Sequence, residues 1–285
     1  VIAVMFLTFT VGSTCLADVV IRIDSAKESS IACEPFNMEM TIRSSQEEQP
    51  HLRLLINGKM IDETVDGKGW RASILPKYVE FIKEGEEYVA RNNLMLFSLG
   101  HGIDEYAPFF DKAGKYEVRV TDKTSSAESN VLVVDVAKPS EHEEEARKLF
   151  VGSKNALWAI VQTGRGAWHG VVRALIRDKE TVTNLEKIIK DYADTPFAPY
   201  AAHIVGMHKY GIAVLRTGGG RLNDLRYRQE LADAIPFFLR ALSVEKSRVQ
   251  EEALFYLQRC NYWRDENKEG EEYYQQLISK YPYGE

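Results

Sequence analysis

Three side chains suited to a binding or catalytic site lie close together in the glycine-bearing stretch GRGAWHG. They are Arg165, Trp168 and His169. An arginine side chain can hold a carboxylate through two parallel hydrogen bonds, and a tryptophan can anchor an apolar partner. The cluster therefore predicts one of two arrangements. It either binds a partner peptide or carboxylate, or it forms an aromatic pair that closes the top of a helical core.

A second candidate is Trp70, which stands in the stretch DETVDGKGWRAS close to Asp62, Asp66 and Lys68. An exposed tryptophan beside polar groups can stack on a sugar ring or on a partner protein. The alternative, which we favour, is that Trp70 folds into the core of a β-sheet domain.

Motifs for catalysis or metal binding are incomplete. HEEEA at 142–146 lacks the second histidine of a zinc-protease motif, and TGGGR at 217–221 lacks the Gly-Lys-Ser/Thr ending of a phosphate loop. His203 and His208 point about 140° apart on a helix, so we expect helix-surface or partly buried histidines that share no metal ion. We expect no catalytic residues, no metal ligands and no cofactor, and we favour a non-catalytic role over an enzymatic one.

Composition bounds the class of protein. A chain of 285 residues with 45% hydrophobic residues suits one or two globular domains. Its formal net charge of -6 argues against a general affinity for nucleic acid, because phosphate binding needs a concentrated basic surface.

The first 17 residues resemble an export signal. An uncharged apolar run is followed by small residues and Ala17, after which a signal peptidase can cut. The run is too short for a membrane span, and it lacks a basic start, so we expect the signal to be incomplete. Gly-Ser-Thr before Cys15 departs from a lipobox, so we expect no lipid anchor. The mature protein would be periplasmic or extracellular, without a membrane span.

Residues 18–138 carry the pattern of β-strands. Apolar residues alternate with polar ones from Phe36 to Ile42, which predicts a half-buried strand. The pair Asn57-Gly58 predicts a tight hairpin, because both residues tolerate positive φ. About seven strands without a long helix predict an antiparallel sandwich. Further strands are expected near 19–23, 52–56, 94–98, 116–120 and 131–136.

The stretch FFDKAGKYEVRVTD at 109–122, followed by SNVLVVDV, resembles the last two strands of bacterial immunoglobulin-like domains. The resemblance implies that Tyr116 forms a tyrosine corner, with its hydroxyl bonded to the nearby backbone. The inter-sheet disulfide of antibody domains is missing, since Cys33 has no partner in this half. Such domains bind proteins or glycans, or act as spacers.

Residues 139–285 change to helical patterning. Ser140 can open a helix in which apolar residues keep helical spacing from Ala146 to Val161. The capping box Thr183-x-x-Glu186 predicts the start of the next helix. We place the domain boundary near 138–141, and we expect Cys260 to be buried on an apolar helix stripe.

The stretch KDYADTPFAPYAAHIVG predicts a sharp turn between two helices. Thr195 can cap the second helix, and Pro196 suits its first position. The alanines at 198, 201 and 202 would let a neighbouring helix approach closely. This is the chemistry of packing.

The helical half is similar to tetratricopeptide-type repeats of exported bacterial proteins. The stretch above is one copy, and EEYYQQLISKYPYGE is the first half of another, with Tyr281 in register with Tyr192. Between them lies a middle helix pair, in which Pro236 falls in a first turn or marks a kink. A repeat stack needs a neighbour or a cap at its end, so we expect the chain to be truncated here.

These features favour a non-catalytic, exported protein-binding or scaffold protein of the bacterial envelope. Its partner would be another protein or an envelope component. One alternative is a hydrolase of envelope polymer, with a site at the domain junction near Arg165, Trp168 and His169. Another is a glycan-binding module that uses Trp70.

Overall fold

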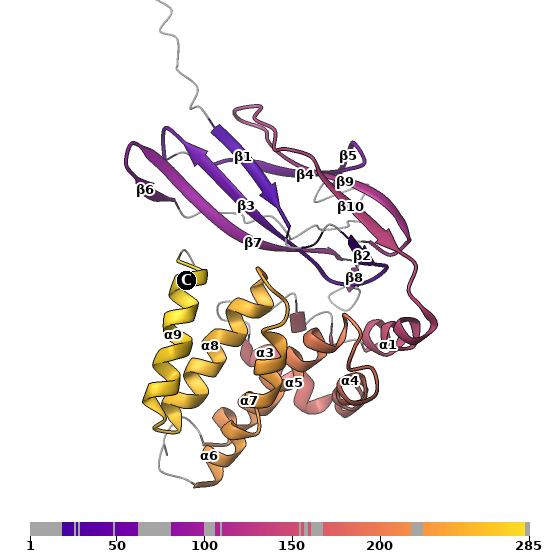
Figure 1. Cartoon of the computed structure of the whole chain (residues 1–285), viewed down its shortest axis with the longest axis vertical. Coiled ribbons are helices and arrows are strands. Elements are labelled where there is room, and N and C mark those ends of the chain that lie inside the picture. The colour runs from indigo at the N-terminus through magenta and orange to yellow at the C-terminus, as the bar shows by residue number, and fades with distance from the viewer. Residues whose placement is uncertain are drawn as a thin grey trace, which may run out of the picture.

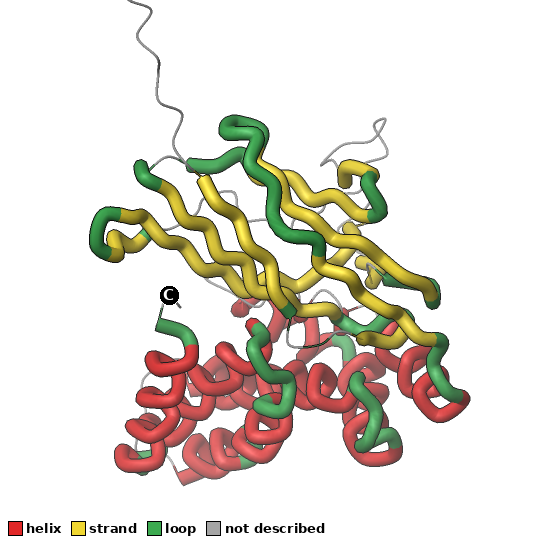
Figure 2. The backbone as a smooth tube through the Cα atoms, turned by 45° about the horizontal axis from the view of Figure 1, so that its top comes forward, coloured by secondary structure: helices red, strands yellow, loops and turns green. Residues whose placement is uncertain are grey.

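The chain is divided into a strand-rich first part and a helical second part, which lie against each other in the computed structural model (Figures 1 and 2). The last strand ends at Ala137, and the first helix begins at Glu141. The described residues are 19–25, 27, 29–47, 49–61, 81–99, 106–108, 110–153, 155–156, 159–160, 168–217 and 225–282.

The strands form two sheets. The first has the order β1-β3-β7-β6, with β8 also paired to β7, and the second has the order β2-β10-β9-β4-β5. Every pairing is antiparallel except that of β2 with β10. The bounds are β1 Val19–Asp24, β2 Ser29–Ile31, β3 Phe36–Ser44, β4 Leu52–Ile56, β5 Lys59–Ile61, β6 Ile82–Glu84, β7 Glu87–Leu99, β8 Tyr106–Pro108, β9 Gly114–Asp122 and β10 Leu132–Ala137.

The core of the strand-rich part follows from alternation in β3. Phe36, Met38, Met40 and Ile42 are all buried, and the residues between them lie on the other face of the sheet. Side chains from both sheets meet in one apolar cluster, in which Phe110 contacts the ring of Phe36. The two sheets therefore share a core, as expected for packed layers.

Two local predictions in this part are confirmed. Asn57 and Gly58 have φ values of 50° and 71° and connect β4 to β5 as a hairpin. The hydroxyl of Tyr116 donates to the carbonyl oxygen of Lys112 over 2.9 Å. Both features depend on residues close in sequence, so the sequence pattern was sufficient to find them.

The strand prediction was incomplete elsewhere. β7 extends over Glu87–Leu99, well beyond the predicted segment near 94–98. Its first half was missed because the polar run Arg91, Asn92 and Asn93 interrupts the alternation of apolar residues. The short strands β2, β6 and β8 were not predicted. Three residues are too few to show a period.

The helices pack largely against their sequence neighbours. α4 contacts α5, α5 contacts α6 and α7, α7 contacts α8, and α8 contacts α9. The bounds are α1 Glu141–Gly152, α3 Trp168–Arg177, α4 Lys179–Asp191, α5 Ala198–Thr217, α6 Leu225–Ala232, α7 Ile235–Ala241, α8 Arg248–Trp263 and α9 Asn267–Lys280.

Two helix starts differ from the sequence prediction. α4 begins at Lys179, not at Thr183, because the carboxylate of Asp178 accepts hydrogen bonds from the backbone N–H and hydroxyl of Thr181. Thr195 does not cap α5. Its hydroxyl donates to the carbonyl of Tyr192 and closes the end of α4, and α5 begins only at Ala198.

The start of α1 was predicted correctly, and its end was not. Ser140 and Glu143 form a reciprocal capping box. The expected continuous helix to Val161 is interrupted at Ser153, whose hydroxyl donates to the carbonyl of Leu149.

The centre of the helical part is α5, which contacts α3, α4, α6, α7 and α8. Its small residues allow this crowding. A Cβ atom on Gly211 would come within 2.2 Å of a Val172 methyl group, and one on Gly206 would come within 2.9 Å of the Phe238 ring. Ala198, Ala201 and Ala202, which were predicted to let a neighbouring helix approach closely, are all fully buried.

The two tyrosines predicted to be in register have the same local role. Tyr192 ends α4 and Tyr281 ends α9, and each backbone N–H donates to the carbonyl four residues earlier. Pro236 lies in the first turn of α7.

No helix of the described residues is long and apolar enough to cross a bilayer, and residues 1–17 lie outside the described part.

Candidate functional site

The four binding residues predicted from sequence lie largely outside the part of the chain that the structure describes. Arg165 and Trp70 are both outside it. Trp168 and His169 form the first backbone turn of α3, but their side chains are not among the described ones. Residues 218–221 of the glycine-rich stretch also lie outside. The described residues point instead to the domain junction and to the outer face of α8.

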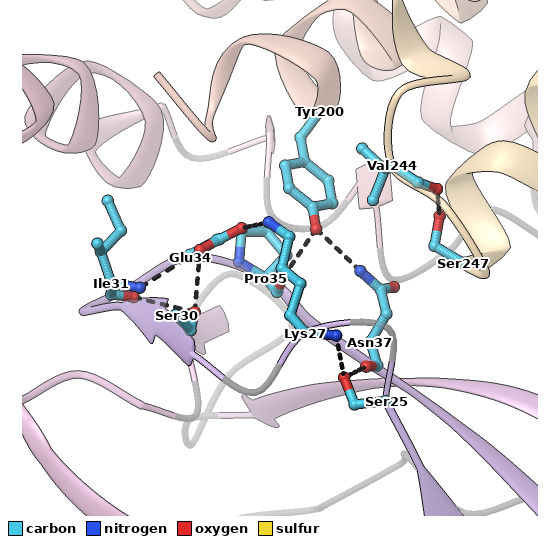
Figure 3. Close-up of polar contacts among 10 residues, drawn as sticks. All are labelled: Ser25, Lys27, Ser30, Ile31, Glu34, Pro35, Asn37, Tyr200, Val244 and Ser247. Atoms are coloured by element: carbon cyan, nitrogen blue, oxygen red, sulfur yellow. Dashed lines mark hydrogen bonds and ion pairs between the residues drawn. The ribbon is translucent and has the colours of Figure 1, made fainter. Parts of the chain in front are cut away.

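At the junction, Tyr200 of α5 reaches across to the strand-rich part. Its hydroxyl donates to the carbonyl of Pro35 and accepts from the side-chain amide of Asn37, both over 2.8 Å (Figure 3). Tyr200 is only 1% exposed. Burial, with a smaller contribution from the charge of Glu34, raises the pKa of this phenol well above its ordinary value, so it stays a neutral hydrogen-bonding group.

Next to Tyr200, the buried carboxylate of Glu34 organises the loop that precedes β3. It forms an ion pair with Lys27 and accepts hydrogen bonds from the hydroxyl of Ser30 and the N–H of Ile31 (Figure 3). A buried carboxylate needs such partners, because losing its water is costly. Ile31 also packs against the helical core, so this loop belongs to the contact between the two parts.

A third junction contact joins Cys33 to α1. Cys33 has a φ of 69°, and its sulfur lies 3.5 Å from an Nη atom of Arg147. Two hydrogen bonds to Glu144, of 2.7 and 2.6 Å, hold the guanidinium in place. Burial raises the pKa of the thiol, and the opposing influence of Arg147 is smaller. Cys33 and Cys260 are both buried free thiols, and Cys260 lies on the apolar side of α8 as predicted.

The described junction is therefore suited to fixing the orientation of the two parts. Tyr200 is buried and protonated, and the carboxylate of Glu34 is engaged by three neighbours. Among the described residues, no group of three or more His, Cys, Asp and Glu side chains is placed to hold a metal ion.

His203 is fully buried in the helical part, and the expectation of a surface or partly buried histidine was wrong for it. Its Nε2 atom lies 3.1 Å from a carboxylate oxygen of Glu252, and the other oxygen accepts from Arg248 over 3.0 Å. The rings of Phe238 and Tyr256 surround the imidazole. His203 is buried because α5 is enclosed by helices on several sides. The residue pattern of a single helix does not reveal such packing.

The outer face of α8 carries large exposed side chains. Phe255, Arg259 and Tyr262 have the spacing i, i+4, i+7, which places them along one side of the helix; we call them the α8 stripe. Phe255 is 38% exposed and Tyr262 is 56% exposed. On the adjoining helix α9, Tyr274 and Ile278 are also exposed.

Within the stripe, the guanidinium of Arg259 lies over the ring of Phe255, 5.1 Å from its centre. This is a cation–π arrangement, which limits the freedom of a long side chain. Its charge also acts on Tyr256, where burial raises the phenol pKa and Arg259 partly opposes that rise. The stripe thus presents two aromatic rings and one positioned cation.

Neither a protein-family model nor a curated protein matches the chain. Among solved structures, it is similar to the CARDB domain of a Pyrococcus furiosus protein, at 15% identity and a TM-score of 0.23. The match covers 42% of this chain and 89% of that domain. A likeness of this size assigns neither half of the chain to a family.

Sequence reasoning missed the junction residues and the α8 stripe. The stripe has a signal in the sequence, since an aromatic, an arginine and a tyrosine recur at helical spacing in FYLQRCNY. The junction has none, because Tyr200 is separated by more than 160 residues from Asn37 and Pro35.

Proposed function

We propose that the protein is a non-catalytic, exported protein-binding or scaffold protein of the bacterial envelope. It would combine an immunoglobulin-like sandwich with tetratricopeptide-like helical repeats. The observation that carries this proposal is the α8 stripe, in which exposed aromatic side chains lie beside a positioned arginine. Tyrosine and arginine are enriched among residues that dominate binding at protein interfaces.

The finer architecture in this proposal has support in both parts. The two packed sheets and the hydroxyl bond of Tyr116 favour an immunoglobulin-like domain. The serial packing of helices, together with the matching helix ends at Tyr192 and Tyr281, favours a repeat array. Both architectures commonly serve recognition, so a binding role agrees with them.

The proposal is tested by site-specific crosslinking in cells of the source organism. A photoreactive phenylalanine analogue replaces Tyr262 or Tyr274 in the full chain, and adducts are identified by mass spectrometry. We expect the same protein to be crosslinked from both positions. The matched control is Val133, an exposed apolar residue on β10.

A second variant, Phe255→Ala, should remove the adducts at Tyr262 while leaving the fold intact, because the side chain is partly exposed. Equal crosslinking from Val133, or no protein adduct from either tyrosine, would contradict a binding role for this face. In that case an envelope hydrolase or a glycan-binding module would become the better explanation.

A further inference from the structure

We infer that the α8 stripe recognises a carboxylate set beside apolar side chains in a segment of its partner protein. This inference rests on the proposed function and names the chemistry of the partner. It depends on two observations. The arginines at the two ends of α8 have carboxylate partners, and Arg259 between them lies against an aromatic ring.

The arginines at the two ends of the helix already have carboxylate partners. Arg248 donates to Glu252 over 3.0 Å, and Arg264, which follows the last residue of α8, donates to Glu266 over 2.8 Å. Arg259, between them, has no carboxylate of the described residues within ion-pair distance. Its guanidinium instead rests on the ring of Phe255.

This placement leaves the planar guanidinium pre-positioned with donors to spare. A guanidinium carries five N–H donors and matches a carboxylate in a two-point contact. Because the ring of Phe255 supports it, less side-chain entropy is lost when a ligand binds. The arginine is therefore better prepared for a carboxylate than a free surface arginine is.

The neighbouring rings restrict the choice of partner. A wholly apolar segment covering Phe255 and Tyr262 would leave Arg259 desolvated and unpaired, which is unfavourable. A basic segment would place like charges together. A phosphate-rich surface fits poorly with a chain of net charge -6. An acidic residue flanked by aliphatic or aromatic residues satisfies both the rings and the cation.

The experiment profiles the purified full chain on an array of random seven-residue peptides. Wild-type protein should enrich peptides in which Asp or Glu adjoins a large apolar residue. The variant Arg259→Gln should bind those peptides about tenfold more weakly, the equivalent of one charge-assisted hydrogen bond. Arg259→Glu should shift the preference toward Lys or Arg. The matched control is Arg177→Glu, the same reversal on an exposed residue of α3.

The outcomes separate this inference from the proposed function. If apolar peptides bind without an acidic preference, or if Arg259→Glu leaves that preference unchanged, the carboxylate inference is wrong while the binding face stands. If Phe255→Ala has no effect on any enriched peptide, the stripe itself is not a binding face, and the proposed function fails. Circular dichroism and thermal unfolding confirm that each variant is folded.

Discussion

At the scale of single residues, Asp122 shows how one carboxylate can hold a turn. It is buried at the end of β9 and accepts hydrogen bonds from the backbone N–H groups of His51, Thr124 and Ser125 and from the hydroxyl of Ser125. Burial alone would raise its pKa, but these hydrogen bonds outweigh burial and lower it. The ionised form is therefore the one that the folded state prefers.

The depressed pKa predicts a pH dependence. The stabilisation from Asp122 is present above its unfolded pKa, about 4, and is lost as pH falls through the lower folded value. Asp122→Asn should lower the free energy of unfolding at pH 7 by about 1–3 kcal/mol. It should also flatten the loss of stability between about pH 5 and about pH 3, the range over which an aspartate in the unfolded chain titrates.

Urea denaturation at several pH values measures both effects. The control is Asp135→Asn, which changes an exposed carboxylate on β10 and should alter neither quantity appreciably. If the Asp122→Asn protein loses stability with falling pH as steeply as the wild type does, groups other than Asp122 control the loss of stability in acid.

At the scale of elements, the packing of α3 against α5 depends on a missing side chain. Gly211 has the Val172 side chain so close that an added Cβ would lie 2.2, 2.5 and 2.9 Å from three of its carbon atoms. In a helix interior, alanine is favoured over glycine by about 1 kcal/mol. At position 211 the free-energy cost of the clash with Val172 should exceed that gain in helix propensity.

Gly211→Ala is therefore expected to destabilise the protein by about 1–3 kcal/mol, the usual cost of overpacking a core. Thermal unfolding measures the change. Adding Val172→Ala should recover part of the loss, because it removes the two nearest methyl groups. Gly152→Ala is the matched control, since a Cβ there meets nothing within 4 Å. A neutral or stabilising Gly211→Ala would mean that α3 and α5 can separate at little cost.

At the scale of the whole molecule, three polar contacts between described residues join the strand-rich and helical parts. Tyr200 binds Pro35 and Asn37, and Arg147 contacts Cys33, with Ile31 packed into the helical core. Hydrogen bonds that are buried wholly or in part need a defined geometry, so they favour one relative orientation of the two parts. The two parts are expected to unfold together.

Tyr200→Phe tests this coupling. It removes a hydroxyl that serves two partners and leaves the carbonyl of Pro35 and the amide of Asn37 unpaired, which should cost about 1–3 kcal/mol. Hydrogen exchange should then increase around residues 33–37 as well as at the start of α5. Tyr262→Phe, on an exposed residue, should change stability by less than about 0.5 kcal/mol. Increased exchange confined to α5 would show that the two parts are energetically independent.

The order of the two parts and several local features could be predicted from the sequence alone. Alternation in β3, the Asn57-Gly58 hairpin, the hydroxyl bond of Tyr116 and the capping box at Ser140 all rest on residues a few positions apart. Short-range patterns of this kind are physically sufficient, because the partners are fixed by backbone geometry.

Helix starts were predicted less accurately, because several neighbouring residues can each act as the N-cap of a helix. Asp178 capped α4 in place of Thr183, and Thr195 closed the preceding helix rather than opening the next. Sequence spacing ranks such candidates by type, and the hydrogen bonds actually formed decide among them.

The exposure of several side chains could be read only from the packing of elements that are distant in sequence. The sequence could not show that α5 is enclosed by helices, so it did not reveal the burial of His203 or the reach of Tyr200 to Pro35. The burial of Cys260 was predicted from helical spacing, but the exposure of Phe255 and Tyr262 on the same helix was not, because large aromatic side chains are equally common in helix cores. Burial depends on elements distant in sequence, whereas periodicity reports only the face on which a residue lies.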